Sequence, residues 1–186
     1  MGPGPGLACS VTLNSALGAE QQRLYQDPLV IQRLLRETRT IAVVGLSTDP
    51  QRASWFVANY MKKEGYRIIP VNPKADAIMG ERCYPSLAAV PGPVDMVDMF
   101  RPAAEATAIA REAVAIGAKA LWLQLKLVNL EAARIASRAG LAVVMDRCVK
   151  IEHGRYQGGL HWAGMNTEII TARRARPRVT AARTLQ

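Results

Sequence analysis

The sequence is poor in the residues that build metal centres and disulfide frameworks. Its 186 residues include two histidines and three cysteines, and Cys9, Cys83 and Cys148 lie far apart with no CxxC pair. Such cysteines predict neither a disulfide framework nor a zinc site, and they fit a reducing compartment. No carboxylates accompany the histidines at metal-binding spacing. We therefore expect no bound metal and a cytoplasmic protein.

The sequence also lacks long apolar runs. No segment approaches the roughly 20 apolar residues of a membrane-spanning helix, so we expect a soluble protein without a membrane partner. Acidic residues are missing from the last fourteen positions, which supply five arginines to the net charge of +9. We interpret residues 173–186 as a basic disordered tail rather than a nucleic-acid-binding surface.

Several catalytic and nucleotide-binding motifs are absent. The chain contains no GxGxxG, no GxxxxGK[ST] and no GxSxG. These absences argue against a standard dinucleotide fingerprint, a nucleoside triphosphate loop and a serine hydrolase. No Ser-His-Asp order or close carboxylate pair suggests itself either, so the sequence predicts no catalytic residues.

The chain divides by composition into four parts. Residues 1–19 are uncharged and rich in glycine and proline at their start, which predicts a flexible leader. Residues 20–150 carry regular hydrophobic patterns and form the predicted domain. Residues 151–172 are loop-like and rich in glycine and aromatics, and we expect them to pack on the domain as a C-terminal extension. The basic tail follows.

Within the domain, apolar strands alternate with helices. Asp27 and Pro28 form a cap and first turn for a helix that precedes the first strand. Predicted strands lie at 40–45, 66–72, 94–100, 118–124 and 141–146, and predicted helices lie at 54–65, 103–117 and 129–140. Each of these three helices ends on a glycine. Strands that are apolar throughout are typical of a parallel sheet covered on both faces. The predicted fold class is α/β, a single domain with a Rossmann-like doubly wound parallel sheet of about five strands and flanking helices.

The turn after the first strand is suited to an anion. Gly45 permits a tight turn and is followed by Leu46 and Ser47, while Arg52 and Ser54 lead into a helix N-terminus. Free N–H groups, hydroxyls and a guanidinium favour a phosphate. An ordinary turn with a serine cap and a solvated arginine fits the same residues equally well.

The end of the second strand reads Asn72, Pro73, Lys74. NAD sites usually carry an acid at this point to hold the ribose hydroxyls. A lysine there favours a ligand with an extra negative charge, as in NADP or coenzyme A. The alternative is a plain turn in which Lys74 meets only solvent.

The remaining strand ends bring further polar residues to the same rim of the predicted sheet. Ligands of open α/β sheets bind at this rim. The residues are Arg101, Gln124, Asp146, Arg147 and Cys148. Cys148 is the only plausible nucleophile among them, although a structural or merely tolerated cysteine is the more common case.

The segments "AVVGLSTDPQRASWFVANYMKKEGYRIIPVNPK", "GERCYPSLAAVPGPVDMVDMFR", "AIGAKALWLQ" and "AGLAVVMDRCVKIEH" together resemble the small bacterial CoA-binding proteins. These are single Rossmann-like domains similar to the N-terminal domain of the succinyl-CoA synthetase α subunit. The resemblance covers roughly residues 29–174. It implies coenzyme A as the ligand and no established reaction.

Carried over by position, the resemblance implies one set of contacts. The phosphate loop falls on Gly45, Leu46, Ser47, Arg52 and Ser54, and the basic turn on Asn72, Pro73 and Lys74. The rest of the set is Phe100, Arg101, Gln124, Asp146, Arg147 and Cys148. One position departs from the pattern: Lys126 stands where the family usually has glycine soon after "WLQ".

We therefore expect a protein that binds coenzyme A or an acyl-CoA through its first βα turn, with the thiol arm along the strand ends and without catalysis of its own. Two alternatives remain open. One is an NADP-dependent oxidoreductase, and the other is a module that senses acyl-CoA and passes the signal to a protein partner. A homodimer is equally compatible with the sequence.

Overall fold

The fold centres on one parallel sheet. The structure is a computed structural model that describes residues 16–157. Five parallel strands pair in the order β2-β1-β5-β6-β7. Their bounds are β1 (Thr40–Val44), β2 (Arg67–Val71), β5 (Met96–Met99), β6 (Ala120–Leu123) and β7 (Ala142–Val144). The predicted Rossmann-like sheet is thereby confirmed.

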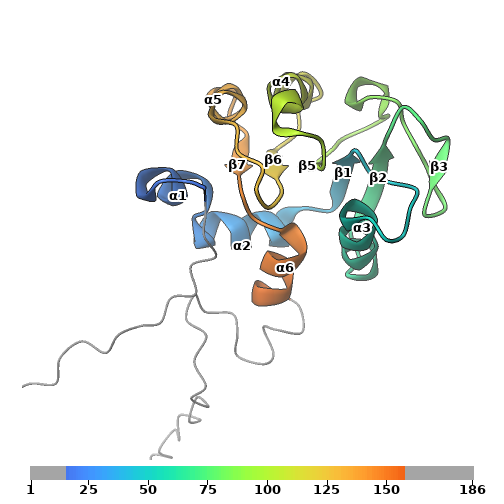
Figure 1. The fold of residues 1–186 in the computed structure, drawn as a ribbon, viewed down its shortest axis with the longest axis horizontal. Coiled ribbons are helices and arrows are strands. Elements are labelled where there is room, and N and C mark those ends of the chain that lie inside the picture. Colours follow the sequence, from blue (N-terminus) through green and yellow to red (C-terminus); the bar gives the residue numbers. More distant parts are fainter. Residues whose placement is uncertain (1–15, 158–186) are drawn as a thin grey trace, which may run out of the picture.

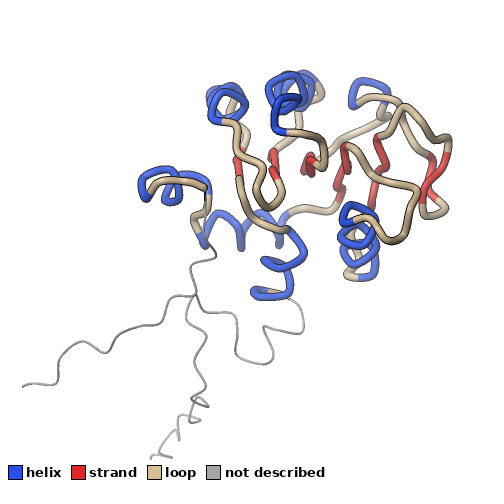
Figure 2. The backbone as a smooth tube through the Cα atoms, viewed as in Figure 1, coloured by secondary structure: helices blue, strands red, loops and turns tan. Residues whose placement is uncertain are grey.

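Helices cover both faces of this sheet (Figures 1 and 2). On one face lie α2 (Pro28–Glu37), α3 (Ala53–Lys63) and α6 (Val149–Tyr156), and on the other α4 (Ala106–Ala115) and α5 (Leu130–Arg138). The short helix α1 (Ala19–Tyr25) lies beside the β7 edge, where Tyr25 O accepts a hydrogen bond from Met145 N. In residues 16–157 no helix has the length and apolar character that crossing a bilayer demands.

The continuous apolar strands follow from this two-sided cover. Ile41 and Val43 of β1 pack in the core cluster shared with α2 and α3, whereas Ala42 and Val44 pack in the cluster shared with α4 and α5. Every residue of a central strand thus faces a helix layer. A strand with one solvated face would alternate apolar and polar residues instead.

Local signals in the sequence set the helix ends. The Asp27 carboxylate accepts hydrogen bonds from Leu29 N and Val30 N, which caps α2 as expected. Gly65, Gly117 and Gly140 all have positive φ, and each directly precedes the chain that enters the next strand. The three predicted glycine stops are therefore confirmed.

The structure differs from the sequence-based expectation after residue 150, where a loop was predicted. Residues 149–156 instead form α6, and Glu152, His153 and Tyr156 are buried in it. The sequence shows no apolar stripe here, because the buried side of α6 includes the polar residues Glu152 and His153, which have hydrogen-bonding or charged partners. Tyr60 Oη lies 3.0 Å from His153 Nδ1, and Arg155 lies 3.3 Å from the Glu152 carboxylate.

Two smaller features also differ from the expectation. A hairpin of β3 (Ala77–Ile78) and β4 (Glu81–Arg82) follows β2, and Leu17, within the expected leader, is buried in the core. Residues 1–15, 158–172 and the basic tail at 173–186 lie outside the described part of the chain.

The direction in which the strands follow one another across the sheet reverses at one point, between β1 and β5. From β1 the chain winds to β2 on one side, and the later strands extend from β5 on the other. The ends of β1 and β5 thus flank the switch point, where doubly wound sheets bind their ligands.

Candidate functional site

The turn after β1 is tight and leaves no room for a side chain at its first residue. Gly45 has a φ of +85°, and its N–H donates to Val71 O at 2.9 Å. A β-carbon added there would lie 2.7 Å from Arg101 Cδ and 3.2 Å from Phe100 O. Glycine is therefore needed for both conformation and space.

The rest of this turn is held by its own hydroxyls. Ser54 Oγ accepts from Ser47 N at 3.1 Å, and Ser47 Oγ accepts from Asp49 N at 3.0 Å. Arg52 precedes α3 without capping it, and its exposed guanidinium lies 3.8 Å from Asp49. The N-cap residue of α3 consequently makes no side-chain hydrogen bond to the N–H groups of the first turn. Leu46 is fully buried, and its carbonyl oxygen accepts from Asn72 Nδ2, so this residue shapes the turn and does not line its surface.

Asn72 joins the turns that follow β1 and β2. Its Nδ2 donates to Leu46 O at 2.8 Å, and its Oδ1 accepts from Lys74 N at 2.9 Å. Both ends of this amide thus serve the fold. Lys74 remains exposed beside the turn.

These turns border a cavity of about 580 Å³, the polar cavity. Eight of the predicted site residues line it together with Ala53. They are Gly45, Ser47, Arg52, Ser54, Asn72, Lys74, Phe100 and Arg101. A smaller cavity of about 200 Å³ adjoins it through Gly45, Asn72 and Arg101, and Pro73 lines this second space.

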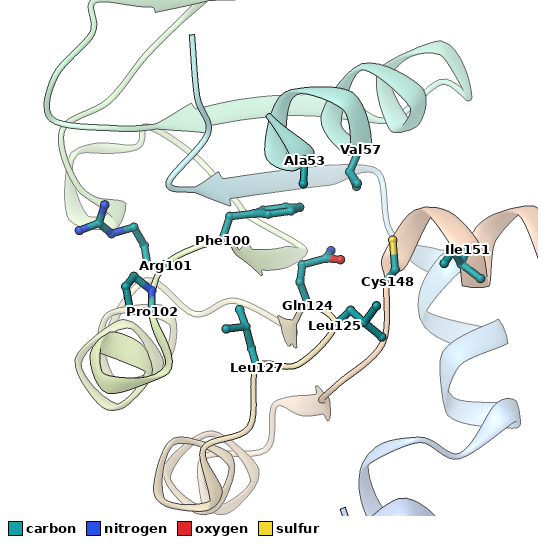
Figure 3. Close-up of a pocket in the computed structure, with 10 residues that line it drawn as sticks. All are labelled: Ala53, Val57, Phe100, Arg101, Pro102, Gln124, Leu125, Leu127, Cys148 and Ile151. Atoms are coloured by element: carbon teal, nitrogen blue, oxygen red, sulfur yellow. The ribbon is translucent and has the colours of Figure 1, made fainter. Parts of the chain in front are cut away.

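The Arg101 guanidinium is paired with Glu105, the N-cap residue of α4. Its Nε and Nη2 donate to the two carboxylate oxygens of Glu105, both at 2.9 Å, and this hydrogen-bonded pair raises the pKa of Arg101. Figure 3 shows its guanidinium turned away from Gln124 and Cys148. A phosphate that binds Arg101 would share or replace this carboxylate.

A third cavity of about 480 Å³, the apolar cavity, shares Ala53, Phe100 and Arg101 with the polar cavity. Its other walls are mainly apolar, and Figure 3 shows them around a central space. They are Val57, Pro102, Leu125, Leu127 and Ile151, with Gln124 and Cys148 as the polar members. The site therefore combines a polar half with an apolar half.

Behind the apolar cavity lies Asp98, which sequence reasoning missed. It is almost fully buried in β5, and its Oδ1 accepts from Gln124 Nε2 at 2.7 Å. Burial raises the pKa of Asp98 to about 7, and the hydrogen bond from Gln124 opposes this only in part. The available signal was an acid with apolar neighbours on both sides, in the stretch "MVDMF" of the predicted strand.

Cys148 lines the apolar cavity at the start of α6. Burial raises the pKa of its thiol, although the N–H groups of Ile151 and Lys150 act in the opposite direction. At neutral pH the group is therefore a thiol rather than a reactive thiolate.

Like Leu46 and Pro73, the predicted residues Asp146 and Arg147 line neither the polar nor the apolar cavity. The buried Asp146 carboxylate accepts from Lys126 N at 2.7 Å and Ala16 N at 3.0 Å, so it organises loops. Arg147 lies 3.8 Å from Glu152, and its carbonyl accepts from Trp122 Nε1.

Lys126, at the position where glycine was the usual residue, adopts the glycine-like φ of +65°. The hydrogen bond from its backbone N–H to Asp146 holds this conformation. Its side chain is exposed and does not line the apolar cavity. Within residues 16–157, no three His, Cys, Asp or Glu side chains gather as a metal site would require.

The protein is thus a doubly wound α/β domain with adjoining polar and apolar cavities at the switch point of its sheet. The chain belongs to the family described as the CoA binding domain, whose sequence pattern matches residues 39–154. The resemblance inferred from the sequence is thereby confirmed.

The chain is also similar to individual proteins. The chain is 40% identical over 123 residues to the uncharacterized protein YneT of Bacillus subtilis, covering 66% of this chain and 91% of that one. A hypothetical protein from Pyrococcus horikoshii has a solved structure with 36% identity and a TM-score of 0.67, covering 69% and 90% of the two chains. An ADP-forming acetate–CoA ligase of Archaeoglobus fulgidus is 36% identical over 67 residues, which are 35% of this chain and 10% of the ligase.

Proposed function

We propose that this protein binds coenzyme A or an acyl-CoA, with the phosphorylated nucleotide in the polar cavity and the thiol-bearing arm in the apolar cavity. The observation that carries the proposal is the junction of the two cavities at Ala53, Phe100 and Arg101. Because the two cavities share these lining residues, one elongated ligand could occupy both of them. Coenzyme A has the matching composition, because a highly charged nucleotide continues into a long arm of low charge.

The polar half offers the groups that phosphates need. The uncapped N-terminus of α3 supplies backbone N–H groups, and Arg52 and Lys74 supply positive charge from the two turns. We assign Arg52 and the Gly45–Ser47 turn to the pyrophosphate. Lys74, on the neighbouring turn, is assigned to the ribose 3′-phosphate.

The main rival is an NADP-dependent oxidoreductase, for which Lys74 would equally suit a phosphate. The second half of a dinucleotide is a charged nicotinamide ribose unit that requires polar partners. The apolar cavity offers Val57, Leu125, Leu127 and Ile151 instead. This mismatch favours coenzyme A.

We further propose that the protein does not turn over its ligand by itself. A nucleophile needs a base within hydrogen-bonding reach, and Cys148 has a raised pKa beside a cavity whose other polar lining groups are Gln124 and Arg101. Regulation of a protein partner through acyl-CoA binding remains compatible with this chemistry.

Titration calorimetry with CoA, NADPH and NADH tests the proposal directly. We expect CoA to bind more tightly than either dinucleotide. Mass spectrometry of protein purified under native conditions would name any acyl group that remains bound. Preference for NADPH over CoA would refute the ligand, and sustained metal-independent hydrolysis of an acyl-CoA, abolished in Cys148→Ser, would refute the absence of turnover.

A further inference from the structure

Gln124 is the polar exception on the buried side of the apolar cavity. Its side chain is 5% exposed and lines the cavity, and Figure 3 shows it between Phe100 and Cys148. An amide in such surroundings costs free energy unless its groups find partners. Its orientation therefore decides what the cavity can recognise.

Asp98 fixes that orientation. Gln124 Nε2 donates to Asp98 Oδ1 at 2.7 Å, and within residues 16–157 Gln124 Oε1 has no hydrogen-bond partner. A carboxylate only accepts hydrogen bonds, so it draws the NH₂ group toward itself and turns the carbonyl oxygen away. The amide accordingly keeps one free acceptor.

The position of Asp98 argues against a role in packing alone. It is 1% exposed at the centre of the sheet, in register with Val43 on β1 and Trp122 on β6. Both neighbours are uncharged, and within residues 16–157 the Asp98 carboxyl makes no hydrogen bond apart from the one that it accepts from Gln124. A buried carboxyl with so little compensation destabilises the fold, which is expected where function retains it.

We propose that Gln124 Oε1 accepts a hydrogen bond from an N–H or S–H donor on the buried arm of the ligand, and that Asp98 is the positioning residue that holds the amide for this contact. The inference rests on the proposed function, because the arm of coenzyme A offers both donors in an amide N–H and a terminal thiol. In this contact the ligand donates the hydrogen bond and the protein accepts it, and Asp98 keeps the acceptor in place. An arm that carried only acceptors at this depth would meet the Gln124 oxygen unfavourably.

Two variants and their combination test the proposal by calorimetry with CoA. Gln124→Met keeps the shape and removes the acceptor, so affinity should fall about three- to tenfold, as for a neutral hydrogen bond. Asp98→Asn can hold the amide in either orientation, so affinity should fall about twofold. The double variant should bind like Gln124→Met alone, because Asp98 acts only through Gln124.

Other results overturn the inference in distinguishable ways. If wild type binds CoA and Gln124→Met binds it equally well, the recognition is refuted while the proposed function stands. Additive losses in the double variant would give Asp98 a structural effect of its own. A wild type that binds no CoA would overturn the proposed function and this inference together.

Two further ligands identify the donor. Desulfo-CoA lacks the thiol, and acetyl-CoA replaces its S–H with a thioester. If the amide N–H is the donor, Gln124→Met weakens CoA, desulfo-CoA and acetyl-CoA alike. If the thiol is the donor, only CoA is affected. A loss confined to acetyl-CoA would refute the role of Gln124 Oε1 as an acceptor.

The pH dependence supplies a readout that a structural role would not give. With its pKa near 7, Asp98 becomes protonated below neutrality and can donate to Gln124 Oε1, which turns the amide. Among residues 16–157, the other titratable group that interacts with Asp98 is the thiol of Cys148, the N-cap of α6, and it stays neutral in this range. Affinity of wild type for CoA should therefore fall about two- to tenfold from pH 8 to pH 6. Asp98→Asn, which retains the titration of the ligand itself, should lack this component, and equal profiles would refute the positioning role.

Discussion

Gly45 and Arg101 approach each other so closely that a β-carbon on Gly45 would lie 2.7 Å from Arg101 Cδ. The two residues follow β1 and β5, the strands that flank the switch point of the sheet. The absence of a side chain at Gly45 therefore lets the two turns that border the polar cavity pack closely together. A side chain at position 45 would push Arg101 and the β5 exit away.

We predict that Gly45→Ala weakens CoA binding at least tenfold and destabilises the protein by about 2 kcal/mol or more, because strain and a clash add. Gly65→Ala is the matched control. Gly65 also has positive φ, but a β-carbon there meets nothing within 4 Å. It should lose about 1 kcal/mol of stability and keep its affinity. Calorimetry and urea unfolding measure both, and equal affinities of the two variants would contradict the spacing argument.

The assignment of the two cations can be separated with one shortened ligand. Lys74→Ala should weaken CoA about tenfold to a hundredfold and leave dephospho-CoA nearly unchanged, because a charge-assisted contact of roughly 1.5–3 kcal/mol is lost only with the 3′-phosphate. Arg52→Ala should weaken both ligands. If Lys74→Ala affects the two equally, Lys74 does not face the 3′-phosphate.

Asp95 directly precedes β5 and Asp98 lies within it, and their pKa values are shifted in opposite directions. Burial acts to raise the pKa of Asp95, but hydrogen bonds from Lys119, Arg39 N and Thr40 outweigh it and leave the pKa lowered. Asp98 has a raised pKa because burial dominates. The two carboxyls should therefore affect stability with opposite signs.

For Asp98, the folded pKa near 7 exceeds the unfolded value near 4, so its carboxyl costs stability as pH rises through this window. Asp98→Asn should raise the free energy of unfolding by about 1–3 kcal/mol at pH 8 and change it little at pH 4. Asp95 stabilises above its unfolded pKa and loses this contribution as pH falls through its lowered value. Asp95→Asn should cost about 1–3 kcal/mol at pH 7 and leave CoA affinity unchanged. Urea unfolding at the two pH values decides the signs, and a destabilised Asp98→Asn at pH 8 would contradict them.

Cys148 should form a mixed disulfide when the protein is treated with CoA disulfide. Its thiolate would attack one sulfur of CoA disulfide and release the other half as CoA thiolate. Because burial raises the pKa of this thiol, the rate should rise about tenfold per pH unit in the neutral range. Intact-mass measurement with peptide mapping locates the adduct, and Cys148→Ser is the control. Adducts found only on Cys9 or Cys83 would show that the thiol arm does not reach Cys148.

The sequence predicted the fold well because its signals are local. Apolar runs mark strands covered on both faces, and glycines mark helix ends. The proximity of Gly45 and Asn72 could likewise be predicted, because each follows a strand and the carboxyl ends of parallel strands meet at one rim of the sheet.

Features that depend on distant partners were not predictable in the same way. The apolar pattern around Asp98 does not reveal that Gln124 lies beside it in the fold. Similarly, α6 has no apolar stripe in the sequence, because its buried residues His153 and Glu152 are polar and contact Tyr60 and Arg147. Asp146 was predicted to bind the ligand from the rim, and nothing in the sequence indicated that its carboxylate accepts a hydrogen bond from Ala16 N, 130 positions earlier in the chain.

The pairing of Arg101 with Glu105 means that the protein carries its own competitor for the guanidinium. In the proposed complex, an incoming phosphate would exchange with a carboxylate that already accepts two hydrogen bonds at 2.9 Å. The number of charge-assisted contacts at Arg101 is then nearly conserved on binding. Arg101 should consequently add little to raw affinity and much to selectivity, since only an anion of the right shape and place can match the fork that Glu105 vacates.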